Sequence, residues 1–420
     1  MTTVQPPRPG IDAADHGTDA LRPTIPAWSH PLALKLFLAA IFLVPVQLEI
    51  ASVRAVIGSR LPPGDIFLAA AVILAPASFR LRRGALGYLP LALPLTLAYG
   101  SIVALVLQGH LTSHSMNVKF LGSMVLVVTA TVTMAYSRAG FAPLIVRRFL
   151  LGVAFWGVVG YIDWRVANIF PWLDHDEVSR FGSLQHDVNN AGALFGVALL
   201  ISWRYGPRVF RYRWTWATVT IWYAVGLGLT LSRSAYIATG AGIAIVLVVD
   251  HVNAEKVMRY AVWVIGIGAF LLASGFVDTA VEDFTNRPDT VSSRNSFVDH
   301  AVDRWVDSRG LGMGLGTFRD ETTFIVHNTG IWLLVEMSIP GIVFFAAMIV
   351  VPFQACLRLR RHDHELAMAL LAAHTAMIVA SVGIEALYQR SWWIVIGMTV
   401  LPAAASLRAD PAPISETSSS

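Results

Sequence analysis

Cysteine and charged side chains are both scarce in this chain of 420 residues. The single cysteine, Cys356, excludes an intramolecular disulfide and any metal site built from several cysteines. Charged residues make up 14% of the sequence, well below the roughly 25% of an ordinary soluble domain. The formal net charge of +4 is small and spread along the chain, so nothing in it indicates nucleic-acid binding.

Long apolar runs are what the sequence has in excess. Hydrophobic residues make up 55% of it, and the mean hydropathy is +0.60. A helix needs about 20 apolar residues to cross a bilayer. We therefore predict an all-α, polytopic membrane protein with about twelve transmembrane helices in a single domain, residues 31–408. The predicted spans are 32–52, 65–79, 86–108, 118–137, 149–164, 189–203, 214–231, 234–250, 258–275, 328–353, 366–385 and 392–407.

The two ends of the chain differ from this apolar background. Residues 1–30 are polar and contain five prolines, and they lack the apolar core and cleavage site of a secretory signal. Residues 409–420 are equally poor in large apolar side chains. We expect both segments to be disordered tails.

Lysine and arginine are divided unequally between the two sides of the predicted membrane domain. With a cytoplasmic N-terminus, 19 of the 31 fall on the inner side, seven on short outer connections and five in one long outer loop, residues 276–326. Cytoplasmic connections are enriched in these residues, so we predict that both termini are cytoplasmic and the long loop faces outward. A cation at the outer boundary is costly unless it is paired, solvated or bound to an anion.

Two outer segments carry candidate anion-binding side chains. Arg233 lies in Thr-Leu-Ser-Arg-Ser, which starts at Thr230 inside an apolar run that suits two spans joined by a tight turn. Arg180 precedes Asn189 and Asn190 at the mouth of another span. A guanidinium group fits the oxygens of a phosphate in bidentate fashion. The alternatives are a structural helix anchor for Arg233 and a capping role for the asparagines.

His327 and Asn328 stand at the start of the tenth predicted span. A histidine there can act as a general base, because its ordinary pKa is close to neutral pH, or it can be structural. Glu336 is nine residues further and half a turn away on a regular helix, so we expect a packing carboxylate or a second-site carboxylate rather than a partner of His327. His374 and Glu385, in or near the eleventh span, have no evident partner in the sequence.

The long outer loop contains a helical pattern followed by a glycine pattern. Phe297, Ala301 and Trp305 lie on one face of a potential helix, which Ser292 or Ser293 can cap and which can rest on the membrane surface. Glycine then recurs at positions 310, 312, 314 and 316 without the Gly-Lys-Ser/Thr ending of a phosphate loop. We interpret this run as backbone that must bend or be approached closely.

Two acidic clusters are candidate metal sites by residue type alone. Asp174-His-Asp-Glu177 contains an Asp-x-Asp pattern on the outer side, and His362-Asp-His-Glu365 lies on the inner side beside three arginines. A solvated loop explains the first equally well and a charge-balanced loop explains the second better. We predict no metal site.

These motifs, taken in order, resemble the O-antigen ligase and polymerase superfamily of bacterial envelope enzymes. Arg294 resembles an arginine found early in the family's loop. Val188 stands where the family often has proline, so whether Asn189 or Asn190 matches the motif stays open. The resemblance covers roughly residues 150–350 and rests on Arg180-Phe-Gly182 with the following asparagines, Thr230-Leu-Ser-Arg233, the long loop with its glycine run, and His327-Asn328 followed by Glu336 and Gly341.

The resemblance implies glycosyl transfer, with inversion and without metal or other cofactor, on the periplasmic face of the bacterial inner membrane. The donor would be a saccharide on undecaprenyl diphosphate. The acceptor would be a sugar hydroxyl, on lipid A-core for a ligase or on another lipid-linked repeat for a polymerase. His327 and Arg233 would be catalytic. The diphosphate and substrate would be bound by Arg180, Arg233, Arg294, Asn189, Asn190 and Asn328.

A transporter of lipid-linked saccharide or another envelope lipid is the alternative function. It would also use outward arginines and broken helices, but it should carry charged residues deep in several spans. The ionisable residues gather mainly at the predicted outer boundary instead. A purely structural envelope protein leaves the placement of His327 and Arg233 unexplained.

Overall fold

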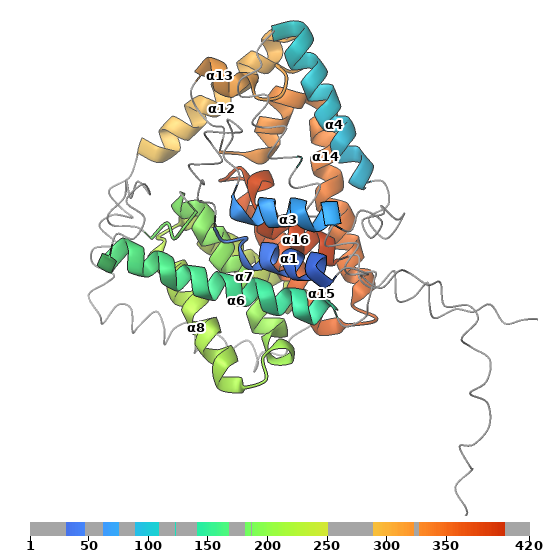
Figure 1. The fold of residues 1–420 in the computed structure, drawn as a ribbon. Helices are drawn as coiled ribbons and strands as arrows, with labels where there is room; N and C mark the ends of the chain where they lie inside the picture. Colours follow the sequence, from blue (N-terminus) through green and yellow to red (C-terminus); the bar gives the residue numbers. More distant parts are fainter. Residues whose placement is uncertain are drawn as a thin grey trace, which may run out of the picture.

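The computed structural model describes residues 31–46, 62–74, 89–108, 122, 141–167, 181–185, 187–250, 289–322 and 327–399. These residues form helices and connecting turns, with no strand among them, which confirms the all-α class (Figure 1). The α-helices are α1 (Pro31–Phe42), α3 (Pro63–Leu74), α4 (Leu89–Val103), α6 (Phe141–Ile162), α7 (Val188–Val209), α8 (Arg213–Leu229), α9 (Arg233–Val249), α12 (Asp289–Asp307), α13 (Thr317–Thr322), α14 (Thr329–Leu359), α15 (His364–Ala380) and α16 (Arg390–Met398). Short π-helices η3 (Ala104–Gln108) and η4 (Asp163–Ala167) extend α4 and α6, and η5 (Ala386–Tyr388) is a 3₁₀ turn.

Helix α15 packs closely against α7 and α9, and these three helices form the core of the bundle. Residues 366–373 of α15 are all buried. Glycine makes the close packing possible: a Cβ atom on Gly242 of α9 would lie 2.6 Å from the carbonyl oxygen of Ala372. A Cβ atom on Gly196 of α7 would lie 2.4 Å from Oγ1 of Thr239. Small residues at helix crossings are typical of membrane helices, because they let the backbones approach.

Among the described residues, two helices are long and apolar enough to cross a membrane, the stretch Ala142–Val166 and α14. Several other apolar helices are shorter, α9 and α15 among them. The predicted spans 118–137, apart from residue 122, and 258–275 lie outside the described residues, and every other predicted span overlaps a helix. These helices fit a membrane protein, whereas the predicted count of twelve spans is not confirmed.

Helix α14 reverses direction at Ser338, where φ is +53° and ψ is −143°. A Cβ atom on Gly341 would lie 2.5 Å from the carbonyl oxygen of Leu333. Eight residues of straight helix rise about 12 Å, so this contact requires two arms, 329–337 and 339–359, that lie side by side. Pro340 assists the break, because it has no N–H to donate to Glu336. The predicted span 328–353 is therefore not one regular helix.

The glycine run of the long loop packs into this break. The peptide N–H of Met313 donates to the carbonyl oxygen of Val335 (2.8 Å), and that of Gly314 donates to Glu336 (3.0 Å). Each glycine at 310, 312, 314 and 316 has a positive φ, between 73° and 92°. A Cβ atom on Gly314 would lie 2.3 Å from the backbone nitrogen of Ala104. The prediction of a bent, closely approached backbone is confirmed.

Helix α12 lies beside α14, and Figure 1 draws it with α13 at the top of the molecule. Its inward face follows the predicted spacing: Ala301 is buried and Phe297 and Trp305 are half-buried. The indole of Trp305 donates to Oγ of Ser338 (3.2 Å), which ties the helix to the reversal of α14. The helix begins at Asp289, so the predicted capping role of Ser292 or Ser293 is wrong.

Candidate functional site

Asp187 defines the start of α7 and sets the two candidate asparagines in its first turn. Its Oδ1 accepts hydrogen bonds from the backbone nitrogens of Asn189 (2.6 Å) and Asn190 (3.2 Å), the bonding pattern of an N-cap. The proposed capping role of the asparagines is therefore wrong. Their side chains are half-buried, and they belong to a helix N-terminus that favours negative charge.

The Thr-Leu-Ser-Arg-Ser segment forms the predicted tight turn, between α8 and α9. Leu231 has φ +49°, a strained value for a residue with a side chain, and Ser232 caps α9. Arg233 is then the first residue of α9 and is half-buried. The hydroxyl of Ser232 donates to Oδ1 of Asn189 (2.8 Å). The two predicted anion-binding motifs therefore meet through the residue that precedes Arg233.

The Arg-Phe-Gly motif reaches the same turn through Phe181. Arg180 itself lies outside the described residues. Phe181 is fully buried, and its backbone nitrogen donates to the carbonyl oxygen of Leu229 at the end of α8 (3.1 Å). The described part of this motif is thus anchored next to the turn that holds Arg233.

His327 precedes the first arm of α14 and is half-buried. Asn328 caps the helix, because its Oδ1 accepts from the backbone nitrogen of Ile331 (3.1 Å). The next residue, Thr329, is fully buried and bonds to another part of the chain. Its backbone nitrogen donates to the carbonyl oxygen of Ser381 (2.8 Å), beyond the end of α15.

Residues 381–386, which we term the bridging loop, connect the histidine motif to the arginine motif. The hydroxyl of Thr329 donates to the carbonyl oxygen of Ile384 (2.9 Å) and accepts from the backbone nitrogen of Ala386 (2.9 Å). On the other side, a Cβ atom on Gly383 would lie 3.1 Å from Cβ of Ser234. Thr329, two residues after His327, and Ser234, next to Arg233, therefore both contact one short loop.

Other predicted residues lie elsewhere or are incompletely described. Glu336 is buried at the reversal of α14, where its Oε2 accepts from the backbone nitrogen of Gly316 (2.8 Å). This fits the expected packing carboxylate. Arg294 lies on α12, and its side chain is outside the described residues. The Asp174–Glu177 cluster is also outside them, and no group of three metal-binding side chains occurs in the part of the chain that the structure describes.

A network of ion pairs joins the opposite ends of α7, α9 and α15. Asp363 caps α15 and also accepts from Arg208, which places the His362–Glu365 cluster in a structural role. The ion pairs are Arg204–Asp250 (2.8 Å), Arg208–Asp363 (3.2 Å) and Arg208–Glu365 (2.6 Å), and Nε2 of His364 lies 3.1 Å from Oδ1 of Asp250. The carboxylates of the cluster are therefore paired with Arg208 of α7, whereas the prediction placed the cluster beside the three arginines next to it in the chain.

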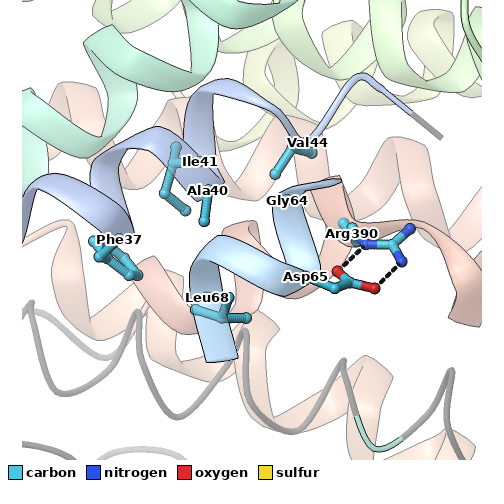
Figure 2. Close-up of a pocket in the computed structure, with 8 residues that line it drawn as sticks. All are labelled: Phe37, Ala40, Ile41, Val44, Gly64, Asp65, Leu68 and Arg390. Atoms are coloured by element: carbon cyan, nitrogen blue, oxygen red, sulfur yellow. Dashed lines mark hydrogen bonds and ion pairs between the residues drawn. The ribbon is translucent and has the colours of Figure 1, made fainter. Parts of the chain in front are cut away.

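Another arginine on the predicted outer side, Arg390, is bound to a carboxylate. Its Nε and Nη2 donate to the two carboxylate oxygens of Asp65, at 2.7 and 2.5 Å. Both residues are nearly fully buried, at the edge of a small pocket between α1, α3 and α16 (Figure 2). The rest of the pocket lining is apolar and includes Phe37 and Leu68. Arg390 thus joins α3 to α16 and is not a candidate anion ligand.

Sequence reasoning missed the residues that bring the motifs together. Asp187 had a signal, since aspartate directly before an apolar helix is a preferred cap. The sequence signal for Thr329 was weaker: it is a hydroxyl residue directly after His327 and Asn328. Gly383 and Ile384 had none, because their role is to contact segments more than 50 residues away in the chain.

No protein-family model matches the chain, and no curated protein matches it.

Proposed function

We propose that this chain is a multi-pass bacterial inner-membrane glycosyltransferase of the O-antigen ligase or polymerase type. It transfers a saccharide from undecaprenyl diphosphate to a sugar hydroxyl on the periplasmic face, in surface polysaccharide synthesis. The supporting observation is the convergence at the bridging loop. Thr329 and Ser234, neighbours of the candidate base His327 and of the candidate phosphate ligand Arg233, both contact residues 381–386.

The chemistry requires positive charge at the diphosphate and a base at the acceptor. The acceptor oxygen attacks the anomeric carbon as the bond from that carbon to the diphosphate oxygen breaks. The electron pair of that bond leaves with the diphosphate, and attack from the opposite face inverts the anomeric centre. Arg233, with Arg180, stabilises the charge that develops on the leaving group. His327 accepts the proton of the acceptor hydroxyl.

The proposed topology puts the site at the outer ends of α7 and α9. The predicted inner ends carry Arg204, Arg208 and Asp250, and the opposite ends carry Asn189 and Arg233. This separation of the ionic network from the candidate site supports the orientation in which both chain termini are cytoplasmic. The lipid carrier then approaches from the membrane with its diphosphate at the outer boundary.

The test is deletion of the gene, followed by analysis of lipid-linked intermediates and surface glycan. Single repeats that fail to lengthen indicate a polymerase, and full chains retained on the carrier indicate a ligase. A normal glycan profile with altered substrate uptake contradicts the proposal and favours the transporter.

The described helices lend the transporter little support. Two buried ionisable groups inside them have structural partners: Glu336 accepts from Gly316, and the ring nitrogens of His374 bond to Ile349 and Trp392. Asp65 and Arg390 lie in the first turns of α3 and α16 rather than in mid-helix.

A further inference from the structure

The bridging loop carries one ionisable side chain, Glu385. Its backbone angles, φ −78° and ψ 73°, are those of the central residue of an inverse γ-turn. The matching hydrogen bond is present, from the nitrogen of Ala386 to the carbonyl oxygen of Ile384 (3.0 Å). Glu385 therefore stands at the tip of a tight turn of defined shape.

The hydroxyl of Thr329 holds this turn in place. It bonds to the carbonyl oxygen of Ile384 and to the backbone nitrogen of Ala386, the two residues that flank Glu385. Thr329 is fully buried and is two residues from His327. The carboxylate-bearing residue is thus fixed to the same helix start that carries the candidate base.

The side chain of Glu385 is half-buried and makes no capping hydrogen bond to η5. Two residues earlier, Gly383 contacts Ser234 beside Arg233. Glu385 therefore belongs to a short segment whose other residues contact Thr329, two residues after His327, and Ser234, next to Arg233.

We propose that Glu385 is a positioning residue of the site, whose carboxylate orients the His327 imidazole for proton removal from the acceptor hydroxyl. The proposal rests on the proposed glycosyl transfer and deepens it. A base whose second nitrogen is oriented by a carboxylate is a recurrent arrangement in nucleophile activation. The diphosphate is a poor partner for a carboxylate, so Glu385 acts on the acceptor side while Arg233 acts on the donor side.

The test compares Glu385→Gln, Glu385→Asp and Glu365→Gln in a deletion strain, with transfer measured from membranes that contain the native lipid-linked donor. Glu385→Gln should lower the transfer rate about 10²-fold or more, with the apparent KM for the donor unchanged. Glu385→Asp should restore part of the loss. Glu365→Gln is the matched control at the opposite end of α15, where the carboxylate is 41% exposed and paired with Arg208; it should behave as the wild type.

A double substitution separates positioning from folding. In a His327→Gln background, Glu385→Gln should cause no further loss, because the residue acts through the histidine. A further loss of the same size in that background, or a wild-type rate for Glu385→Gln, overturns the proposal. Comparable amounts of each variant in the membrane exclude a folding defect. If the wild-type protein itself transfers no glycan, the proposed function fails and this inference fails with it.

Discussion

The two ends of the α7–α9–α15 bundle are held together by different chemistry. At one end, ion pairs centred on Asp250 and Arg208 join the helices. At the other, the described contacts use uncharged groups: the Ser232–Asn189 hydrogen bond, the Thr329 hydroxyl and the approach of Gly383 to Ser234. Charge at the first end serves structure. These contacts involve Ser232, Thr329 and Ser234, which lie within two residues of Arg233 and His327, the side chains to which the proposed function assigns the chemistry.

The largest expected effect is the loss of polysaccharide transfer when Arg233 or His327 is replaced. Arg233→Ala and His327→Ala should each reduce polysaccharide transfer about 10²–10³-fold or more, because each removes a group that stabilises the transition state. The protein should remain in the membrane at normal levels. The measurements are surface glycan by gel and protein amount by immunoblot.

Arg213→Ala is the matched control for Arg233→Ala, since Arg213 is the exposed first residue of α8. It should leave transfer unchanged. Near-normal surface polysaccharide in the Arg233 or His327 variant removes that residue from the mechanism and weakens the contrast between the two ends.

A larger side chain where α7 meets the turn between α8 and α9 should lower the stability of the fold. A Cβ atom on Gly192 would lie 2.7 Å from Cβ of Ala235 and 3.0 Å from Oγ1 of Thr230. Gly192→Val should therefore lower the free energy of unfolding by about 2–3 kcal/mol, as overpacking separates α7 from the turn. Thermal unfolding of the purified protein measures this. Gly240→Ala, at a site with open space, is the control and should be neutral or stabilising. An unchanged midpoint in Gly192→Val contradicts the described helix crossing.

Loss of one hydroxyl should have a moderate effect. Ser232 caps α9 and bonds to Asn189, so Ser232→Ala should cost about 1–2 kcal/mol of stability. Transfer should fall several-fold, since Asn189 and Arg233 lose their shared support. Ser234→Ala, two residues along, should cost less. Equal losses in the two variants would show that the capping contact has no special role.

The smallest effect is expected at the ion-pair end. Arg208 is 51% exposed, and solvent screens its attraction to Asp363 and Glu365. Arg208→Ala should cost at most about 1 kcal/mol and leave glycan transfer at the wild-type rate. A large loss of transfer in this variant, with normal stability, would contradict the proposal, because it would place the functional site at the ion-pair end of the bundle.

The sequence predicted helix positions and the bent glycine run, because each depends on local periodicity or composition. The reversal of α14 was missed, since hydropathy stays high through Ser338 and only Pro340 hinted at a break. The predicted caps failed at Asn189, Asn190, Ser292 and Ser293, where a neighbour or an earlier start took the role. The bridging loop was unpredictable, because its contacts join residues far apart in the chain.

The reversal at Ser338 divides α14 into two helical arms of unequal length. The arm 339–359 is about 31 Å long, which matches the hydrocarbon thickness of a bilayer, and the arm 329–337 is about 13 Å long, less than half of it. The shorter arm can enter the lipid phase from one leaflet only. Under the proposed topology, the imidazole at its foot would therefore lie below the surface of that leaflet, and the proposed acceptor hydroxyl would have to approach it there.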